Sequence, residues 1–298
     1  DEGDIDLNGI ALDETWVREM AGIQLVACGT AWHAAMIGRA MIERFARIPC
    51  DVDLASEYRY REPIVSDRHL VIPVSQSGET ADTIAALREA MRRGAKSLAV
   101  CNVHESTIAR TADHVLYTHA GPEIGVASTK CFTTQVVALS LIALRLALLR
   151  GAMSHAQVRE AAHELRRLPR LVEETLGLWS HVEGIARRHM HARDFLFLGR
   201  GYGFPVALEG ALKLKEISYI HAEGYASGEM KHGPIALIDE NVPVVIVANQ
   251  RSVYGKLISN AEEARARGGI VIAIVEAGNS EAESFANEVI RVPETSFE

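Results

Sequence analysis

The sequence predicts an α/β protein made of two three-layer αβα units with mostly parallel sheets, related by internal duplication. Short apolar runs rich in β-branched residues alternate with helical segments, which is typical of parallel strands buried between two layers of helices. The strand-to-glycine segment ending at Gly29 returns in the segment ending at Gly199, and the run Val71–Val74 returns as Val244–Val247. These matches are offset by 170 to 173 residues, and so small a drift indicates a duplicated unit.

Length and charge narrow the classes of function. The 298 residues are enough for two domains of ordinary size, and 48% hydrophobic with 23% charged residues is a globular composition. A formal net charge of −8 and a pI near 5.9 argue against nucleic acid or an anionic membrane as a partner. Any phosphate site must therefore be local, built from backbone dipoles and hydroxyl groups rather than from a basic surface.

The cysteines and the apolar segments predict a cytoplasmic protein. The four cysteines are widely spaced without a C-x-x-C pair, so we expect buried, reduced thiols and no metal site at Cys28, Cys50, Cys101 and Cys131. The N-terminal residues are acidic and do not resemble a signal peptide. The most apolar stretch, Val136–Leu149, contains Arg145 and is too short to span a bilayer comfortably, so it predicts a helix buried in the core.

In the first half of the chain, the apolar runs predict five strands, at residues 23–28, 50–54, 70–74, 97–101 and 114–118. Helical spacing predicts helices at residues 13–20, 31–46, 81–93 and 131–150, and shorter helical turns near 56–61 and within 102–112. Asp13 is the expected N-cap of the first helix.

A charged helical region joins this half to the second. Ser154–Arg188 has a helical pattern that we expect to break at Pro169 and Gly177, and Phe195 then opens the second unit. The predicted organisation is a linker with an N-terminal helix, a first domain, a helical connection and a second domain incomplete at its C-terminus, over residues 1–20, 21–152, 153–190 and 191–298.

The loop Ser75-Gln-Ser-Gly-Glu-Thr80 carries the most specific chemistry of the first half. It connects a predicted strand to a predicted helix, and such a turn directs free backbone N–H groups and the positive end of a helix dipole at one place. Ser75, Ser77 and Thr80 would add hydroxyl donors, and Gly78 would let the backbone approach a ligand closely. The loop therefore predicts an anion site.

The same loop residues indicate how large the anion would be, and they also allow an interpretation in which no anion binds. No Walker Gly-Lys-Ser/Thr is present, so a single phosphoryl group fits better than a magnesium polyphosphate. A Ser/Thr-capped helix without any ligand fits the loop equally well, and the loop alone leaves both interpretations open. The second unit has Ala248-Asn-Gln250 where the first has Ser75-Gln-Ser77, so only the first is predicted to bind phosphate.

Charged residues in the second half suggest acid–base chemistry. On a helix, Lys213 shares one face with Glu216, three residues later, and with Glu209, four residues earlier. A solvated charged face is the ordinary interpretation, but this segment is apolar enough to be half buried and leads toward His232 in a Gly/Pro loop. Glu216 and His232 are therefore a candidate acid–base pair, although His232 alone would be taken for a surface residue.

Several strings of residues, taken together, are specific for one protein family. They are Cys28-Gly-Thr30, Ser75–Thr80, Glu123-Ile-Gly-Val-Ala-Ser-Thr-Lys130, Leu198-Gly-Arg-Gly201, Leu208–His221 and Lys231-His-Gly-Pro234. From about Ile23 onward the chain resembles the isomerase half of the glucosamine-6-phosphate synthases, the glutamine–fructose-6-phosphate aminotransferases. That half consists of two sugar-isomerase (SIS) domains.

The resemblance implies a role for each matching residue. Ser75, Gln76, Ser77 and Thr80 match residues that hold the sugar phosphate, and Thr30, Ser128 and the backbone of Val126 match further sugar contacts. Glu216 matches the carboxylate that moves a proton between C1 and C2 of the sugar. Lys213 matches a lysine that stabilises the negative charge of the enolised intermediate, and His232 matches a histidine that opens the sugar ring and comes from the neighbouring subunit.

Three departures from the family pattern stand out. Ala31 replaces a serine found in many members, which removes one hydroxyl. The resemblance also implies that a glutaminase domain precedes this chain and that a C-terminal tail follows it, with a lysine that forms a Schiff base with fructose 6-phosphate. No lysine follows Lys256, so we expect this chain alone to bind hexose phosphate weakly and to turn over little or not at all.

The expected partners are fructose 6-phosphate, glucosamine 6-phosphate, the glutaminase domain and a second copy of the chain, with no nucleic acid, membrane or cofactor. Two other functions fit an SIS fold. A phosphosugar-sensing module would need a DNA-binding helix-turn-helix, and no basic segment or helix-turn-helix pattern precedes Ile23. A simple phosphosugar isomerase or deglycase could share the Ser-Gln-Ser loop, but would not be expected to keep the string Leu214-Lys-Glu-Ile-Ser-Tyr-Ile-His221.

Overall fold

The computed structural model describes residues 5–7 and 10–295. Parts of the linker predicted over residues 1–20, and the last three residues of the domain predicted over 191–298, lie outside the described residues. The chain divides into two compact units, Asp1–Leu165 and Arg166–Glu298.

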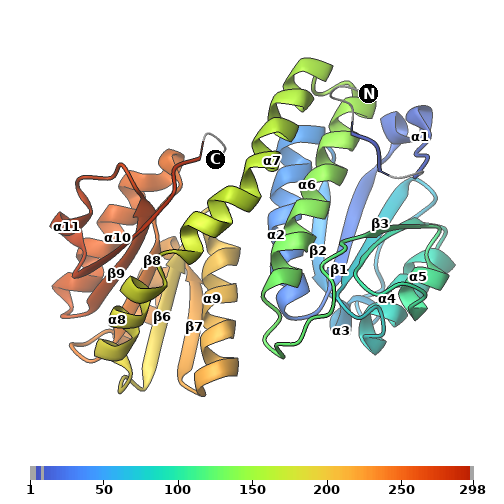
Figure 1. The fold of residues 1–298 in the computed structure, drawn as a ribbon. Coiled ribbons are helices and arrows are strands. Elements are labelled where there is room, and N and C mark those ends of the chain that lie inside the picture. Colours follow the sequence, from blue (N-terminus) through green and yellow to red (C-terminus); the bar gives the residue numbers. More distant parts are fainter. Residues whose placement is uncertain (1–4, 8–9, 296–298) are drawn as a thin grey trace. The chain divides into compact units, whose positions relative to one another are not determined.

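Each unit contains one five-stranded parallel sheet (Figure 1). The first sheet has the order β2-β1-β3-β4-β5, with β1 (Gly22–Ala27), β2 (Cys50–Leu54), β3 (His69–Ser75), β4 (Lys96–Cys101) and β5 (His114–Tyr117). The second has the order β10-β9-β8-β6-β7, with β6 (Asp194–Gly199), β7 (His221–Ala226), β8 (Pro243–Val247), β9 (Ile270–Glu276) and β10 (Glu288–Val292). Read from β7, the second order repeats the first, as the predicted duplication requires.

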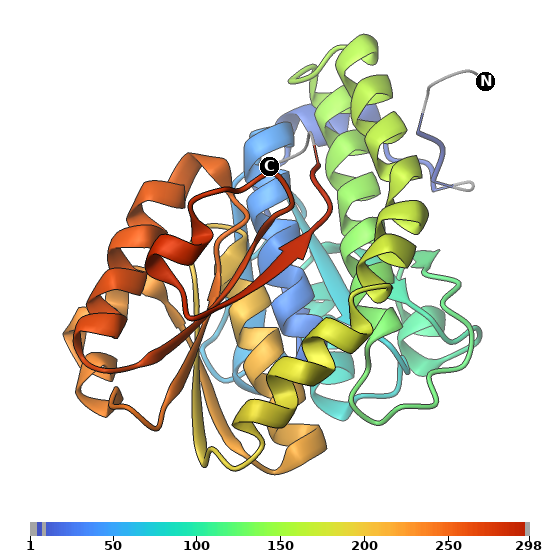
Figure 2. The same ribbon diagram turned by 60° about the vertical axis from the view of Figure 1, so that its left-hand side comes forward.

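Helices cover both faces of the first sheet. One face carries α3 (Ala55–Tyr58), α4 (Ala81–Arg92) and α5 (Thr107–Thr111), whose residues Tyr58, Leu87 and Ile108 share a buried cluster with Val71 of the sheet. The other face carries α2 (Thr30–Met41), the π-helical turn η1 (Ile42–Ala46) and α6 (Lys130–Arg150). The helices α2 and α6 lie side by side in both views (Figures 1 and 2). The short α1 (Glu14–Glu19) begins at its predicted cap, because Asp13 Oδ1 accepts from the Trp16 N–H at 2.7 Å.

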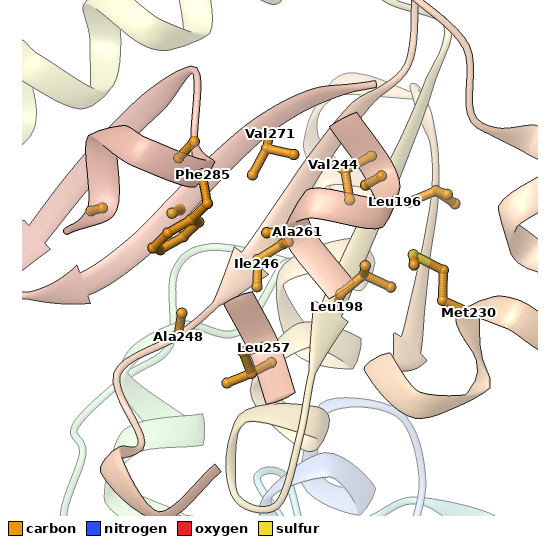
Figure 3. Close-up of a cluster of buried hydrophobic side chains, with 14 of the residues drawn as sticks. Leu196, Leu198, Met230, Val244, Ile246, Ala248, Leu257, Ala261, Val271 and Phe285 are labelled. Carbon is orange, nitrogen blue, oxygen red and sulfur yellow. The ribbon is translucent and has the colours of Figure 1, made fainter. Parts of the chain in front are cut away.

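The second sheet is covered in the same way. On one face, α10 (Tyr254–Ala266), α11 (Ala282–Phe285) and η2 (Ser227–His232) enclose a cluster that includes Leu257, Phe285 and Met230 (Figure 3). On the other face, α8 (Trp179–His189) and α9 (Gly203–Ser218) contribute Ile185 and Ala211 to a second cluster with Phe195 and Val245. Short 3₁₀ turns, η3 (Pro234–Leu237) and η4 (Arg251–Val253), follow η2 and β8.

Two helices differ from their predicted form. The helix predicted over residues 31–46 is regular only to Met41 and ends as the π-turn η1 before Arg47, which has a left-handed backbone (φ 56°). The predicted break at Pro169 was wrong, because α7 (His155–Leu176) continues through it. A proline inside a helix removes one hydrogen bond and bends the axis, but flanking turns can continue the helix. The break at Gly177 is confirmed, since α8 begins afresh at Trp179.

The predicted core helix α6 is longer than the apolar stretch within it. It has 21 residues, and in the part of the chain that the structure describes it is the one helix long and apolar enough to cross a membrane by length and composition. The prediction that this segment is too short to span was therefore wrong on length. Half of its most apolar window is nevertheless buried within the fold, where Leu139, Ile142 and Leu146 are fully enclosed.

The order of the strands determines where a ligand would bind. In the first unit the chain passes from β1 outward to β2 and then returns to β3 on the opposite side of β1. In open parallel sheets, ligands bind outside the carboxyl ends of the strands at such a switch point. The connections from β1 to α2 and from β3 to α4 both start at this edge, and they include Thr30, the first residue of α2, and Ser75–Thr80, which starts at the last residue of β3.

Candidate functional site

Hydrogen bonds within the loop after β3 fix its conformation. In these bonds the serine side chains of the loop accept from its backbone N–H groups. Ser75 is buried, and its Oγ accepts from the Gly78 N–H at 3.0 Å. Ser77 Oγ accepts from the Glu79 N–H at 3.2 Å, and both Gln76 and Ser77 are partly exposed. The Glu79 carboxylate accepts from the Thr107 N–H at 2.7 Å, which ties the loop to α5. Hydrogen bonding to the side chain of Thr107, and then to its backbone, lowers the pKa of Glu79. Ser75 therefore shapes the loop, while Ser77 lies where solvent or a ligand reaches it.

Position 78 requires a glycine for two reasons: its backbone is left-handed, and neighbouring atoms leave no room for a side chain. Its φ is +66°, and a Cβ added there would lie 2.0 Å from Ser106 Oγ and 2.8 Å from Cys101 Sγ. Its carbonyl accepts from the Ile108 N–H at 3.0 Å. The loop backbone is thus pressed against the end of β4 and the start of α5, which fixes its conformation without any ligand.

The first turn of α4 separates the two interpretations of this loop. Thr80 occupies the N-cap position with extended backbone (φ −64°, ψ 114°), but its side chain makes no capping hydrogen bond. The helix is therefore not the Ser/Thr-capped helix of the alternative interpretation. An N-terminus without a side-chain cap presents N–H groups and the positive end of the dipole to an anion, with the Ser77 and Thr80 hydroxyls beside it.

The start of α2 lies at the same edge of the sheet. Gly29, at its N-cap, has the backbone φ 56° and ψ −131° and cannot supply a side-chain cap, and Thr30 follows as the first helical residue, partly exposed. The β1 and α4 segments touch, since Thr83 Oγ1 lies 4.0 Å from Cys28 Sγ. The structure thus brings two helix N-termini without side-chain caps, those of α2 and α4, to the carboxyl ends of adjacent strands.

The loop before α6 reaches the same edge and is fastened at both of its ends. Asn102, just after β4, donates to the Gly121 carbonyl at 2.8 Å and accepts from the Ala120 N–H at 2.9 Å. Glu123 accepts from the Cys131 N–H at 3.2 Å, at the start of α6. Between them Ser128 has a left-handed backbone (φ 57°), and Val126 is 99% exposed. Sequence reasoning missed the fastening residues, because an asparagine and a glutamate in a loop give no signal of their contacts.

In the second unit the corresponding switch point is filled by a side chain. Gln250 Oε1 accepts from the Tyr202 N–H at 3.1 Å, at the start of α9, and its Nε2 donates to Ser252 Oγ at 3.1 Å. Gly201 lies so close that a Cβ there would be 2.5 Å from Gln250 Oε1. A cavity of about 300 Å³ remains beside it, but its Arg251 already pairs with Glu276 (Nε–Oε2 2.9 Å). The arrangement supports the prediction that this unit does not bind phosphate.

Lys213 joins two carboxylates on α9. Its Nζ lies 2.7 Å from Glu216 Oε2 and 3.2 Å from Glu209 Oε1. The side chains are 37% exposed for Glu216, 18% for Lys213 and 8% for Glu209, so the face is only partly solvated. The sequence showed that the three residues share a face, but not that Glu209 is buried.

His232 does not join Glu216 within one chain. Glu216 is in the last turn of α9, and a short connection leads from there to the start of β7, whereas exposed His232 follows the end of β7 in η2. Six residues of strand at about 3.3 Å each separate these positions by roughly 20 Å. An acid–base pair of Glu216 and His232 would therefore need His232 from another copy of the chain.

The described residues contain no group of three His, Cys, Asp or Glu side chains that could hold a metal ion. The four cysteines are free thiols, and burial together with a hydrogen bond to Glu123 raises the pKa of Cys131 to about 12.

Comparison with known proteins identifies relatives over the whole chain. The family model for the SIS domain matches residues 18–145 and again 190–296. A glutamine–fructose-6-phosphate aminotransferase (isomerizing) of Thermus thermophilus is 53% identical over 294 residues, which are 99% of this chain and 48% of that protein. The chain thus spans about half the length of the curated relatives it matches.

Solved structures give the same result. The C-terminal domain of glucosamine-fructose-6-phosphate aminotransferase from Francisella tularensis superposes with a TM-score of 0.90 at 42% identity, covering 96% of this chain and 82% of that one. Glucosamine-6-phosphate deaminase from Thermotoga maritima has a TM-score of 0.72 at 23% identity, covering 86% and 76% of the two chains, which shows a shared fold alone.

Proposed function

Because this chain belongs to the SIS-domain family and is related to the C-terminal domains of the glucosamine–fructose-6-phosphate aminotransferases, we propose that it is the isomerase module of such an enzyme. Its substrate would be fructose 6-phosphate, which ammonia released from glutamine by a glutaminase domain converts to glucosamine 6-phosphate. The observation that carries the proposal is the N-terminus of α4, which lacks a side-chain cap and lies with hydroxyl groups at the switch point of the first sheet.

The phosphate would bind in the first unit. The N–H groups of the first turn of α4 would donate to its oxygens, together with the hydroxyls of Ser77 and Thr80 and the amide of Gln76. Ser75 would act by holding Gly78 in place. Thr30, the backbone of Val126 and the side chain of Ser128 would contact the sugar from the neighbouring loops. A local site of this kind suits a chain with a net charge of −8.

The proton transfer would belong to the second unit. Glu216 would remove a proton from C1 of the ketose form and return it to C2, which converts the ketose to the aldose skeleton. Lys213, 2.7 Å from Glu216, would stabilise the negative charge that develops on the enolised intermediate. His232 of a neighbouring subunit would open the sugar ring, so the active form would be a homodimer. The reaction needs no metal or organic cofactor in this scheme.

Calorimetric titration tests the phosphate site. We expect the chain to bind fructose 6-phosphate, and inorganic phosphate more weakly, and Ser77→Ala to weaken both by about 10- to 100-fold, because one hydrogen bond to a charged group is lost. Ser252→Ala, in the corresponding loop of the second unit, serves as the control and should leave the affinity unchanged. Equal affinities for the parent chain and Ser77→Ala would place the ligand elsewhere, and the absence of binding to both would contradict the proposed function.

A further inference from the structure

Asn102, the first residue after β4, makes hydrogen bonds in two directions. Its backbone N–H donates to the Gln76 carbonyl at 3.3 Å, in the loop that is proposed to hold the phosphate. Its side-chain amide bonds to residues 118–121, which lead into the loop that is proposed to contact the sugar, residues 122–129. One asparagine therefore connects the phosphate loop with the sugar loop of the proposed site.

The side-chain amide of Asn102 makes three hydrogen bonds to the segment before the sugar loop. Its Oδ1 accepts from the Thr118 hydroxyl at 3.1 Å and from the Ala120 N–H at 2.9 Å, and its Nδ2 donates to the Gly121 carbonyl at 2.8 Å. His119 and Gly121 have left-handed backbones, with φ of 50° and 67°, so the chain turns tightly around the amide. Only a side chain with both a donor and an acceptor can make this set of bonds.

The sugar loop is attached at its two ends. Its apolar tip residues bury little surface, because Ile124 is 91% and Val126 99% exposed. At the far end the Glu123 carboxylate accepts from the Cys131 N–H at 3.2 Å, which closes the loop on itself at the start of α6. At the near end Asn102 attaches the loop to β4, the strand beside the one that leads into the phosphate loop.

A stack of aromatic rings lies beside the amide. The ring centroids of His104 and Tyr117 are 3.9 Å apart, and the His119 ring lies 5.8 Å from that of His104. These rings join the same two segments as Asn102, one after β4 and one at the end of β5. We therefore expect the two segments to stay folded together when the Asn102 amide is removed, with the sugar loop less fixed in direction.

We propose that Asn102 is a positioning residue that holds the sugar loop in place relative to the bound phosphate. The inference rests on the proposed function, because it takes Gln76 to contact the phosphate and Val126 and Ser128 to contact the sugar. A sugar phosphate gains affinity when the loop that contacts it is already in place, whereas inorganic phosphate gains nothing from that loop. Asn102 acts through the two loops and not by touching the ligand.

Calorimetric titration with two ligands tests this role. In Asn102→Ala we expect the affinity for fructose 6-phosphate to fall about tenfold, and that for inorganic phosphate to change less than about twofold. The phosphate loop is spared because the backbone bond to Gln76 remains in this variant. Thr118→Val removes one of the three bonds to the amide and should weaken fructose 6-phosphate by a smaller factor, about twofold.

The ratio of the two affinities distinguishes positioning from a merely structural role. A loss of folded chain would weaken both ligands by the same factor. Equal factors for the two ligands in Asn102→Ala, or no change in either affinity, would therefore overturn the inference. Asn287→Ala is the matched control, because Asn287 Oδ1 likewise accepts from a backbone N–H, that of Val271 at 2.9 Å, but in the second unit. It should leave both affinities unchanged.

Ser77→Ala separates failure of the inference from failure of the proposed function. If Ser77→Ala weakens both ligands while Asn102→Ala gives equal factors, only the role of Asn102 is overturned. If the parent chain binds neither ligand, the proposed function is overturned, and the inference that rests on it falls as well.

Discussion

At the scale of single residues, the candidate phosphate loop depends on the lack of a side chain at Gly78 and on the lack of a side-chain cap at Thr80. Gly78 lies where a side chain would meet Ser106 and Cys101, and Thr80 leaves the N–H groups of α4 without a side-chain cap. Ser75 is buried, and its Oγ accepts from the Gly78 N–H within the loop. The loop is therefore preorganised, so a phosphoryl group would find its donors in place.

Gly78→Ala tests this preorganisation. The substitution should lower the free energy of unfolding of the first unit by about 2–4 kcal/mol, from the left-handed backbone and from the contact with Ser106, and should abolish phosphate binding. Gly121→Ala is the matched control, because its φ of +67° is nearly the same and nothing lies within 4 Å of the added Cβ. It should cost only about 1 kcal/mol, measured by urea unfolding. Equal costs would show that crowding at Gly78 is unimportant.

At the scale of elements, α4 must keep its N-terminus fixed, and its last turns contribute an ion-pair network. Glu89 accepts from Arg92 at 2.8 and 2.9 Å and from Arg93 at 2.6 Å. These hydrogen bonds lower the pKa of Glu89 from 4.5 to about 2. A lowered carboxyl pKa contributes stability that is complete above the ordinary value and is lost as the pH falls through the lowered one.

Glu89→Gln should therefore reduce stability at pH 7 by less than about 1 kcal/mol, since Arg92 is largely exposed and solvent screens the pair. The difference from the parent chain should shrink between about pH 5 and pH 2, and be absent below about pH 2. Urea unfolding midpoints across this range measure it. A difference that grows as the pH falls would contradict the assigned sign.

Most elements of the fold were predictable, because strand runs buried on both faces and capped helices leave strong local patterns. Asp13 and the strand at residues 50–54 were found at their predicted places. The continuation of α7 through Pro169 was not predictable, since the surrounding turns outweigh the lost hydrogen bond there. In the candidate site, the sequence indicated which residues cluster on a loop or a helix face. It gave no signal for Asn102 and Glu123, whose partners lie 8 to 19 residues away, or for the burial of Glu209.

At the scale of the whole molecule, the fold separates the two proposed acid–base residues. Glu216 precedes β7 and His232 follows it, so one chain does not bring them together. The proposed chemistry then requires a second copy to supply the histidine, which a symmetric dimer would do twice. Sedimentation at micromolar concentration should accordingly show a dimer, and a single species of 32.5 kDa would count against it.

Mixing variants tests the shared site directly. Because we expect this chain alone to turn over little or not at all, the variants are made in the full-length enzyme. There, Glu216→Gln and His232→Ala should each abolish exchange of the C1 proton of fructose 6-phosphate with deuterated water. Dimers re-formed from an equal mixture should regain about a quarter of the parent rate, because half of them are mixed and each mixed dimer has one intact site of two. A mixture as inactive as its components would show that both residues act from the same chain.

The Gln250 side chain in the second unit has one more consequence. Because it is tethered to the loop it occupies, its amide is present at the start of α9 at an effective concentration on the order of millimolar or above. A free anion at ordinary metabolite levels would compete poorly against such a resident group. In the first unit, occupancy of the proposed anion site would then depend on the concentration of the sugar phosphate. In the second unit, the Gln250 side chain occupies the corresponding position at any concentration, so only the first unit would respond to a change in sugar phosphate.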